Sequence, residues 1–237
     1  MNIIITGASQ GIGYEISKIF ADNSENTIIA VSRNEKKLEQ LKNDCSEINA
    51  DSKLVPVPFD LERILSDPDD LTRIILQHFD HIDILINNAG LLINKLFMDT
   101  SYEEALKIYN LNLFTPAILI KILSPCMGKK GISHVVNISS MAGYQGSSKY
   151  PGLSYYSSSK AALASLTECL SREFKNTRTY FNSLALGSVQ TKMFSDAFPG
   201  LKAMMTPGQM AEFIVDFALN GYKYFRGKII PVSISNP

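Results

Sequence analysis

Short runs of aliphatic residues alternate with longer amphipathic segments along the whole 237-residue chain. Several of the runs lack polar alternation, which is typical of parallel strands covered on both faces. We therefore expect a parallel sheet with right-handed crossovers and helices on both faces. The predicted strands are Asn2–Thr6, Thr27–Val31, Lys53–Pro58, Ile82–Ile86, His134–Ser139, Tyr180–Leu186 and Lys228–Val232.

The segments between these strands carry apolar residues at helical spacing. Leu38, Leu41 and Cys45 are three and four residues apart, which puts them on one face of a helix. Asp67 followed by Pro68 predicts an N-cap and the first turn of another helix. Two longer helices with wide apolar faces are predicted over Asn112–Met127 and Tyr156–Phe174.

The length of the chain favours a single domain over residues 1–237. Two loose stretches, residues 143–155 and 192–207, each follow a predicted strand. Open α/β sheets bind ligands beyond the carboxyl ends of their strands. We therefore expect these two stretches to form the substrate loops.

The composition argues against several classes of function. The 23 basic residues balance the 23 acidic ones, so neither a nucleic-acid partner nor a membrane surface is expected. The three cysteines and three histidines are scattered, which predicts reduced thiols and no metal site. Because the sequence shows no cleavable leader and no apolar run of the ~18 residues that a membrane span needs, we expect a cytoplasmic protein.

A glycine-rich loop, Thr-Gly-Ala-Ser-Gln-Gly-Ile-Gly at residues 6–13, joins the first predicted strand to a helix. Glycines permit positive φ and close backbone approach, and the N–H groups at a helix start can bind a pyrophosphate. A tight turn without a ligand is the alternative, but the strand–loop–helix context favours a dinucleotide in a single-domain Rossmann fold. The loop residues expected at the cofactor are Gly7, Ser9, Gln10, Gly11, Ile12 and Gly13.

Tyr156 and Lys160 lie four residues apart at the start of a predicted helix and therefore share a face. A phenol has a pKa near ~10, and a neighbouring ammonium favours its ionised form. Such a pair can exchange a proton with a carbinol oxygen while hydride moves. A surface pair is the alternative, but it fits poorly with a position after the fifth strand. Tyr155 lacks a lysine partner, because Ser159 stands four residues later.

With these motifs the chain resembles the short-chain dehydrogenase/reductase family. The resemblance extends to Asn-Asn-Ala-Gly at residues 87–90, where Asn88, Ala89 and Gly90 are expected beside the cofactor. It implies that Ser140, rather than Ser139, hydrogen-bonds the substrate oxygen, although Ser140 also fits a strand-end turn. It implies that Asn112, rather than Asn110, supports a water near Lys160, although a packing role is the alternative. Tyr156, Lys160, Ser140 and Asn112 would then form the catalytic set.

The end of the second strand bears on the choice of dinucleotide. An NAD site usually carries a carboxylate there, whereas this chain has Ser32 and Arg33. A guanidinium can bind a 2′-phosphate through paired hydrogen bonds, so we expect NADP in preference to NAD. The alternative is that Arg33 is simply solvated. The resemblance implies that Asp60 and Leu61 contact the adenine, although Asp60 reads equally well as a helix cap.

The chain departs from the family pattern at two loops. The Pro-Gly that usually follows the sixth strand is replaced by Leu186 and Gly187, while Val189 and Thr191 match positions that contact the nicotinamide amide. An apparent insertion lies within residues 145–154. The segment 192–207 is expected to form a lid with apolar side chains, or to pack into the core. Its large apolar residues are Met193, Phe194, Phe198 and Met204.

These observations lead to two hypotheses of function. The first is an NADPH-dependent oxidoreductase that reduces a carbonyl, or oxidises an alcohol, on a small organic substrate with Tyr156 as proton donor or acceptor. The second is a non-catalytic NADP-binding sensor or assembly protein. Because relatives pair their long apolar helices across two-fold axes, we also expect a homodimer or homotetramer.

Overall fold

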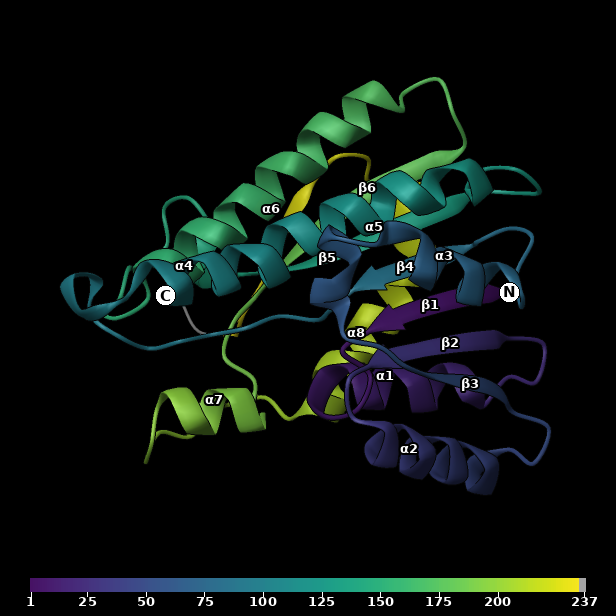
Figure 1. The fold of residues 1–237 in the computed structure, drawn as a ribbon, viewed down its shortest axis with the longest axis horizontal. Coiled ribbons are helices and arrows are strands. Elements are labelled where there is room, and N and C mark those ends of the chain that lie inside the picture. The colour runs from purple at the N-terminus through teal and green to yellow at the C-terminus, as the bar shows by residue number, and fades with distance from the viewer. Residues whose placement is uncertain (235–237) are drawn as a thin grey trace.

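A computed structural model describes residues 1–234 of the chain. It contains one seven-stranded parallel sheet in the order β3-β2-β1-β4-β5-β6-β7 (Figure 1). The strands are β1 Asn2–Thr6, β2 Thr27–Ser32, β3 Lys53–Pro58, β4 Ile84–Asn87, β5 Ser133–Ser140, β6 Thr179–Leu186 and β7 Ile229–Val232. The predicted doubly wound parallel sheet is confirmed. The prediction of one domain over 1–237 includes residues 235–237, which lie outside the described residues.

Helices cover both faces of the sheet, as the uninterrupted aliphatic strands require. Ile3 and Ile5 of β1 pack with α1, α2 and α8, whereas Ile4 points to the opposite face, where α3, α5 and α6 pack. The helices are α1 Gly11–Ala21, α2 Glu35–Ile48, α3 Pro68–Leu76, α4 Tyr102–Tyr109, α5 Thr115–Leu123, α6 Ser154–Glu173, α7 Lys192–Ala197 and α8 Pro207–Asn220.

The predicted helix Asn112–Met127 is part of a longer helical stretch, Tyr102–Cys126, with a π-helical turn at Asn110–Phe114 between α4 and α5. Its mean hydropathy of 1.3 over an 18-residue window, of which 39% is buried, meets the length and composition criteria for a membrane span. Core helices meet the same criteria. Here α5 buries Leu119 and Leu123 completely against the sheet.

Two local predictions need correction. The fourth strand begins at Ile84 rather than Ile82, because Ile82 forms only an isolated bridge to Met127. Helix α3 does begin at Pro68, but the Asp67 side chain makes no capping hydrogen bond. Pro68 has no N–H, and its fixed φ suits a first helical turn, so the helix starts there without help from the carboxylate.

Candidate active site

A cleft of about 1160 Å³ opens at the carboxyl ends of the strands. The strand order reverses between β1 and β4, and the loops on either side of this point diverge, as they do at ligand sites of open α/β sheets. The loops after β1, β2, β4, β5 and β6 all contribute to the walls of the cleft. The sequence motifs from the two halves of the chain therefore meet in one cavity.

The glycine loop forms one wall of the cleft and requires glycine for two reasons. Gly7 and Gly11 have φ values of 70° and 62°, the region that favours glycine. A Cβ on Gly13 would stand 2.5 Å from the carbonyl oxygen of Gly7 and 2.6 Å from the Asn88 amide nitrogen. Gly13 itself does not line the cleft, in contrast to the other predicted loop residues. Its role is to let the loop fold tightly onto the start of α1.

The second family motif packs directly on this loop. The Asn88 side chain donates to the carbonyl of Thr6 at 3.0 Å, and the Thr6 hydroxyl accepts from the backbone N–H groups of Asn88 and Ala89, each at 3.0 Å. Asn88 therefore fixes the spacing between the loops after β1 and β4. Ala89 and Gly90 also line the cleft.

Ser32, Arg33, Asp60 and Leu61 line the end of the cleft next to the glycine loop. The Ser32 hydroxyl donates to the Ser9 hydroxyl at 2.7 Å. Asp60 accepts a hydrogen bond from the Glu62 N–H at 3.1 Å, so it caps the short 3-10 helix that follows while still facing the cleft. The helix-cap interpretation of Asp60 is confirmed, and the expected contact with an adenine stays a prediction.

Lys37 also lies at this end of the cleft, although no sequence motif indicates it. Its ammonium donates to the Gln10 side-chain oxygen at 2.6 Å, and both residues line the cavity. Lys37 lies in the first turn of α2, whereas Arg33 precedes the Asn34 N-cap, so helical spacing does not relate the two cations. The Gln10 side chain thus holds Lys37 of α2 next to the glycine loop.

Tyr156 and Lys160 both face the cleft from the first two turns of α6. Lys160 is only 4% exposed, and its ammonium donates to the Ile138 carbonyl at 2.8 Å. Burial lowers the pKa of Lys160 from 10.5 to about 8. A Cβ on Gly90 would lie 3.3 Å from the Lys160 nitrogen, so the loop after β4 packs tightly against this lysine.

The phenol of Tyr156 has a raised pKa, chiefly because burial disfavours the phenolate; a hydrogen bond with Ser140 acts in the opposite direction. The sequence-based expectation that a nearby ammonium favours the phenolate is not met in the protein alone, because burial has the largest effect on the pKa of Tyr156. The phenol is therefore neutral at neutral pH.

The two adjacent serines after β5 have different partners. The Ser139 hydroxyl is buried and donates to the Lys160 carbonyl at 2.8 Å, which fixes α6 to the sheet. The Ser140 hydroxyl accepts from the Ala142 N–H at 3.1 Å and also hydrogen-bonds Tyr156. Ser140 is therefore the serine beside the phenol, and it also has the strand-end turn geometry that the sequence left open.

Asn112 is completely buried behind the cleft and does not line it. Its amide oxygen accepts from the Leu91 N–H at 2.8 Å, and its amide nitrogen donates to the Leu91 carbonyl at 2.9 Å and to Ser159 at 3.0 Å. Its side chain thus fixes the loop after β4 to α6. Asn112 lies in the π-helical turn, where N–H groups bond to carbonyls five residues earlier, as the Thr115 N–H does to the Asn110 carbonyl.

The loop after β6 completes the cleft. Val189 and Thr191 line it, and a Cβ on Gly11 would lie 3.4 Å from the Thr191 methyl group. Gln190 provides order where the family's proline is missing: its N–H donates to the Met205 carbonyl at 2.8 Å, and its side-chain oxygen accepts from the Ala203 N–H at 2.8 Å. No pattern in the sequence indicates this role of Gln190.

The lid segment contains the short helix α7, whose apolar side chains Met193 and Phe194 line the cleft together with Phe198. Met204 does not line it and is 70% exposed, so the expectation that it adds apolar surface to the pocket is wrong. Among residues 1–234, no group of three or more His, Cys, Asp or Glu side chains could hold a metal ion.

The chain is similar to known proteins over most of its length. The family model for short chain dehydrogenase matches residues 1–202. The ketoacyl reductase HetN of Nostoc sp. is 34% identical over 221 residues, which cover 90% of this chain and 73% of that protein. A Drosophila melanogaster protein, dehydrogenase/reductase SDR family protein 7-like, is 30% identical over 230 residues, or 92% of this chain and 69% of that one.

Solved structures share the fold. A short chain dehydrogenase from Shigella flexneri, crystallised with NADP, has a TM-score of 0.86 to this chain at 24% identity, over 97% of this chain and 95% of that one. The likeness extends over almost all of both chains, so the sheet order and the helix layers are common to the two proteins.

The buried Lys160 makes the stability of the protein depend on pH. Below pH 8 the folded and unfolded states both carry the charged ammonium, and the folded state bears its full burial cost. Between about pH 8 and 10.5 the unfolded state binds the proton more strongly, so this contribution to stability rises with pH. We expect the free energy of unfolding of the wild type to gain about 3 kcal/mol relative to Lys160→Met over this interval.

Urea denaturation of both proteins at a series of pH values measures this difference. Other titrating groups are common to the two proteins and cancel. The hydrogen bond to Ile138 that the variant loses adds an offset, whereas the slope with pH reports the lysine. A difference that stays constant between pH 7 and 10.5 would show that Lys160 is hydrated.

Proposed function

The chain belongs to the short-chain dehydrogenase family of oxidoreductases, and on this premise we propose that it uses NADPH to reduce a carbonyl group on a small organic substrate. The observation that carries the proposal is the meeting of Tyr156, Lys160 and Ser140 with the glycine loop in one cleft. A non-catalytic NADP-binding protein would need the loop but not the buried Tyr–Lys pair.

The cleft has the donors and the space that a dinucleotide needs. The glycine loop leaves backbone N–H groups at the start of α1 for a pyrophosphate, and no side chain projects from Gly7 or Gly11. Lys160 would bind ribose hydroxyls, and Val189 and Thr191 would meet the nicotinamide amide. The bound cofactor supplies the hydride.

Two cations support NADP as the preferred cofactor. Arg33 and Lys37 line the cleft at the end of β2, beside the hydroxyls of Ser9 and Ser32. Charge-assisted hydrogen bonds from such groups favour a 2′-phosphate over a free ribose hydroxyl. The Shigella flexneri neighbour was crystallised with NADP, which is in keeping with this preference.

Tyr156 is the proposed proton donor. Its raised pKa keeps the phenol protonated at neutral pH, as reduction requires. As hydride reaches the carbonyl carbon, the Tyr156 hydroxyl gives its proton to the carbonyl oxygen, and the product is an alcohol. Ser140, hydrogen-bonded to the phenol, orients the same oxygen. The ammonium of Lys160 stabilises the phenolate that remains.

Asn112 acts indirectly in this proposal. Its side chain holds the loop after β4 against α6, so it keeps Gly90 next to the Lys160 nitrogen. In the proposed reaction Asn112 also supports a water that returns a proton towards Lys160 and Tyr156. Asn112 is therefore a positioning residue in this chain.

The substrate end of the cleft is mostly apolar. A ketoacyl reductase is among the relatives, so a 3-oxoacyl thioester belongs in the substrate panel together with a simple ketone, a pterin and a sugar. The side chains at this end are Leu92, Met141, Tyr150, Leu153, Met193, Phe194, Phe198 and Leu201.

Replacing Tyr156 with Phe tests the proposed chemistry. We expect NADPH oxidation on the best substrate of the panel to fall by about 10²–10⁴-fold, because the proton donor is lost while the ring remains. Tyr155→Phe is the matched control: Tyr155 stacks on Phe97 with ring centroids 5.5 Å apart and is not part of the proposed machinery. Unchanged turnover in Tyr156→Phe, or an equal loss in both variants, would refute the assigned role.

Removing the two cations tests the cofactor preference. In Arg33→Leu and in Lys37→Met we expect the Kd for NADPH, measured by fluorescence titration, to rise by roughly 10-fold or more, because each loses a charge-assisted hydrogen bond. The Kd for NADH should stay within about twofold.

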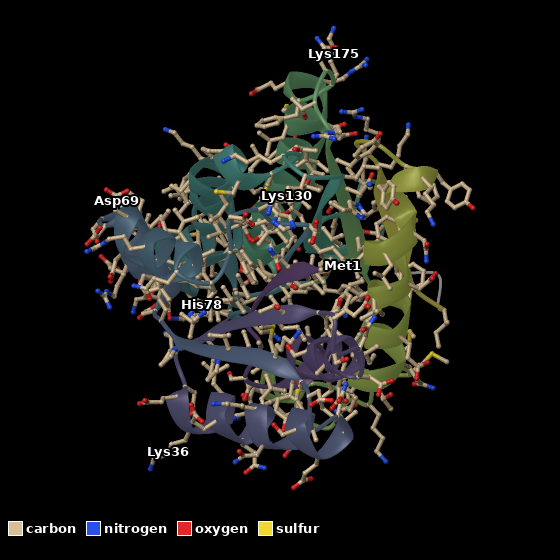
Figure 2. All side chains as sticks on the ribbon, turned by 90° about the vertical axis from the view of Figure 1, so that its right-hand side faces the viewer. Met1, Lys36, Asp69, His78, Lys130 and Lys175 are labelled. Carbon is tan, nitrogen blue, oxygen red and sulfur yellow. The ribbon has the colours of Figure 1, made fainter. Side chains whose placement is uncertain are left out.

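Lys36→Met provides the control for lost charge. Lys36 lies on the same helix but outside the cleft, and its side chain points away from the molecule (Figure 2). If the Lys36 variant weakens NADPH binding as much as the Lys37 variant, a general charge effect explains the data. If the affinities for NADPH and NADH fall equally, the preference does not come from these cations.

We further propose that the protein is a cytoplasmic homodimer or homotetramer. The exposed apolar side chains Tyr102, Leu106 and Phe114 along α4 and the π-helical turn support an interface there. Size-exclusion chromatography with light scattering should give at least twice the 26.2 kDa mass of the chain, and a monomer would contradict the interface. Recovery of a tagged chain in the membrane pellet would contradict the location.

A further inference from the structure

Three segments that are distant in sequence meet at the mouth of the cleft. They are the loop after β4, the insertion within residues 145–154, and the lid helix α7. In Figure 1 the loop after β4 runs along the left side of the molecule, on the side where α7 projects from the body of the fold. The contacts between the three segments are specific, and none of them belongs to the proposed proton-transfer set.

The first contact joins the loop after β4 to the end of α7 across the mouth of the cleft. The Asn94 amide nitrogen donates to the carbonyl of Ala197, the last residue of α7, at 2.7 Å. Asn94 also lines the cleft, as do Phe194 and Phe198 on either side of Ala197. We refer to the hydrogen bond between Asn94 and Ala197 as the clasp.

The second contact connects the insertion to Lys95, the residue that follows Asn94. The Lys95 N–H donates to the Gly152 carbonyl at 3.0 Å. Gly152 has a φ of 85°, and a Cβ at this position would lie 2.0 Å from the Asn94 side-chain oxygen. The positive φ and this close approach explain why glycine stands at residue 152, where the insertion packs against Asn94.

The third contact fixes one side of the clasp to the body of the protein. The Lys95 ammonium pairs with Glu104 at 2.8 Å, and Glu104 also caps the start of α4 through the Ser101 N–H. The insertion is held by Lys149, which donates to the Tyr144 carbonyl at 2.6 Å. The loop after β4 and the insertion thus form a common support for Asn94.

The lid side has few other attachments. Helix α7 has six residues and buries none of them. Within residues 1–234, its remaining hydrogen bonds are made inside the segment 190–201, to its own turns and to Gln190 and Thr191. Because no core packing holds α7, a single hydrogen bond at its end has a large influence on where it lies.

We propose that Asn94 is a positioning residue that clasps α7 over the substrate end of the cleft and so restricts the reaction to compact apolar carbonyl substrates. The inference rests on the proposed function. With the clasp formed, Met193 and Phe194 of α7 line the same cleft as Tyr156, and a long substrate would have to displace the helix. Loss of the clasp frees α7, which loosens the fit of short substrates and admits long ones.

Asn94→Asp is the sharpest variant, because the side chain keeps its shape beside Gly152 but can no longer donate to Ala197. We expect amide hydrogen exchange in residues 192–198 to accelerate roughly five- to tenfold, with the rest of the protein unchanged. Gly152→Ala should have the same effect by displacing Asn94. Met98→Ala is the control, since Met98 lies in the same loop and is 88% exposed.

Kinetics with a short and a long homologue of the carbonyl class that the wild type reduces test the specificity role. For ketones the pair is acetophenone and 4-phenylacetophenone. In Asn94→Asp we expect the KM of the short ketone to rise several-fold and the ratio of kcat/KM, short over long, to fall about fivefold. The Kd for NADPH should not change, because the clasp lies at the substrate end.

Unchanged exchange of α7 in Asn94→Asp would overturn the clasp. Faster exchange with an unchanged substrate ratio would overturn its role in specificity. The exchange measurement needs no substrate, whereas the proposed chemistry stands or falls with Tyr156→Phe. A failure of one is therefore distinguishable from a failure of the other.

Discussion

The segment after β4 is the structural centre of this protein, because it packs without spare volume between the glycine loop and α6. On one side Asn88 bonds Thr6 and lies against Gly13, where even a methyl group would clash. On the other side Gly90 lies close to both the Lys160 nitrogen and the Asn112 amide oxygen. The spacing between the glycine loop and the Tyr–Lys pair is therefore set by close contacts of the Asn88, Lys160 and Asn112 side chains with the glycine backbone.

Burial then determines the protonation states in the cleft. It lowers the pKa of Lys160 and raises that of Tyr156, so both groups shift towards their neutral forms. A neutral phenol next to a lysine that can release or accept a proton near pH 8 suits reduction followed by reprotonation of the phenolate. The substrate end, with its apolar walls and its weakly anchored helix α7, is built on different contacts from the cofactor end.

Much of this could be predicted from the sequence, since parallel strands, a glycine loop and a Tyr–Lys pair are local patterns whose physical causes are local. The strands around Ile4 and Val136 were found because buried parallel strands are uninterrupted aliphatic runs. Lys37 could not be found in this way, because its partner Gln10 is 27 residues away and meets it only after β1 and β2 pair.

The contact of Asn94 with Ala197 was even harder to predict than that of Lys37, because the two residues are 103 positions apart. Nothing in the intervening sequence indicates that they meet. The exposure of Met204 was mispredicted for a related reason. An apolar residue in a short lid can face solvent when no core lies beneath it, and sequence periodicity does not report what lies beneath a loop.

We propose that one cleft aligns a phosphorylated dinucleotide with Tyr156, and a crystal structure of the wild-type protein with NADPH would show whether it does. We expect the 2′-phosphate between Arg33 and Lys37, the pyrophosphate at the start of α1, and the nicotinamide end within hydrogen-bond reach of Lys160 and next to Tyr156. A cofactor bound with its nicotinamide end away from Tyr156, or outside this cleft, would refute this alignment.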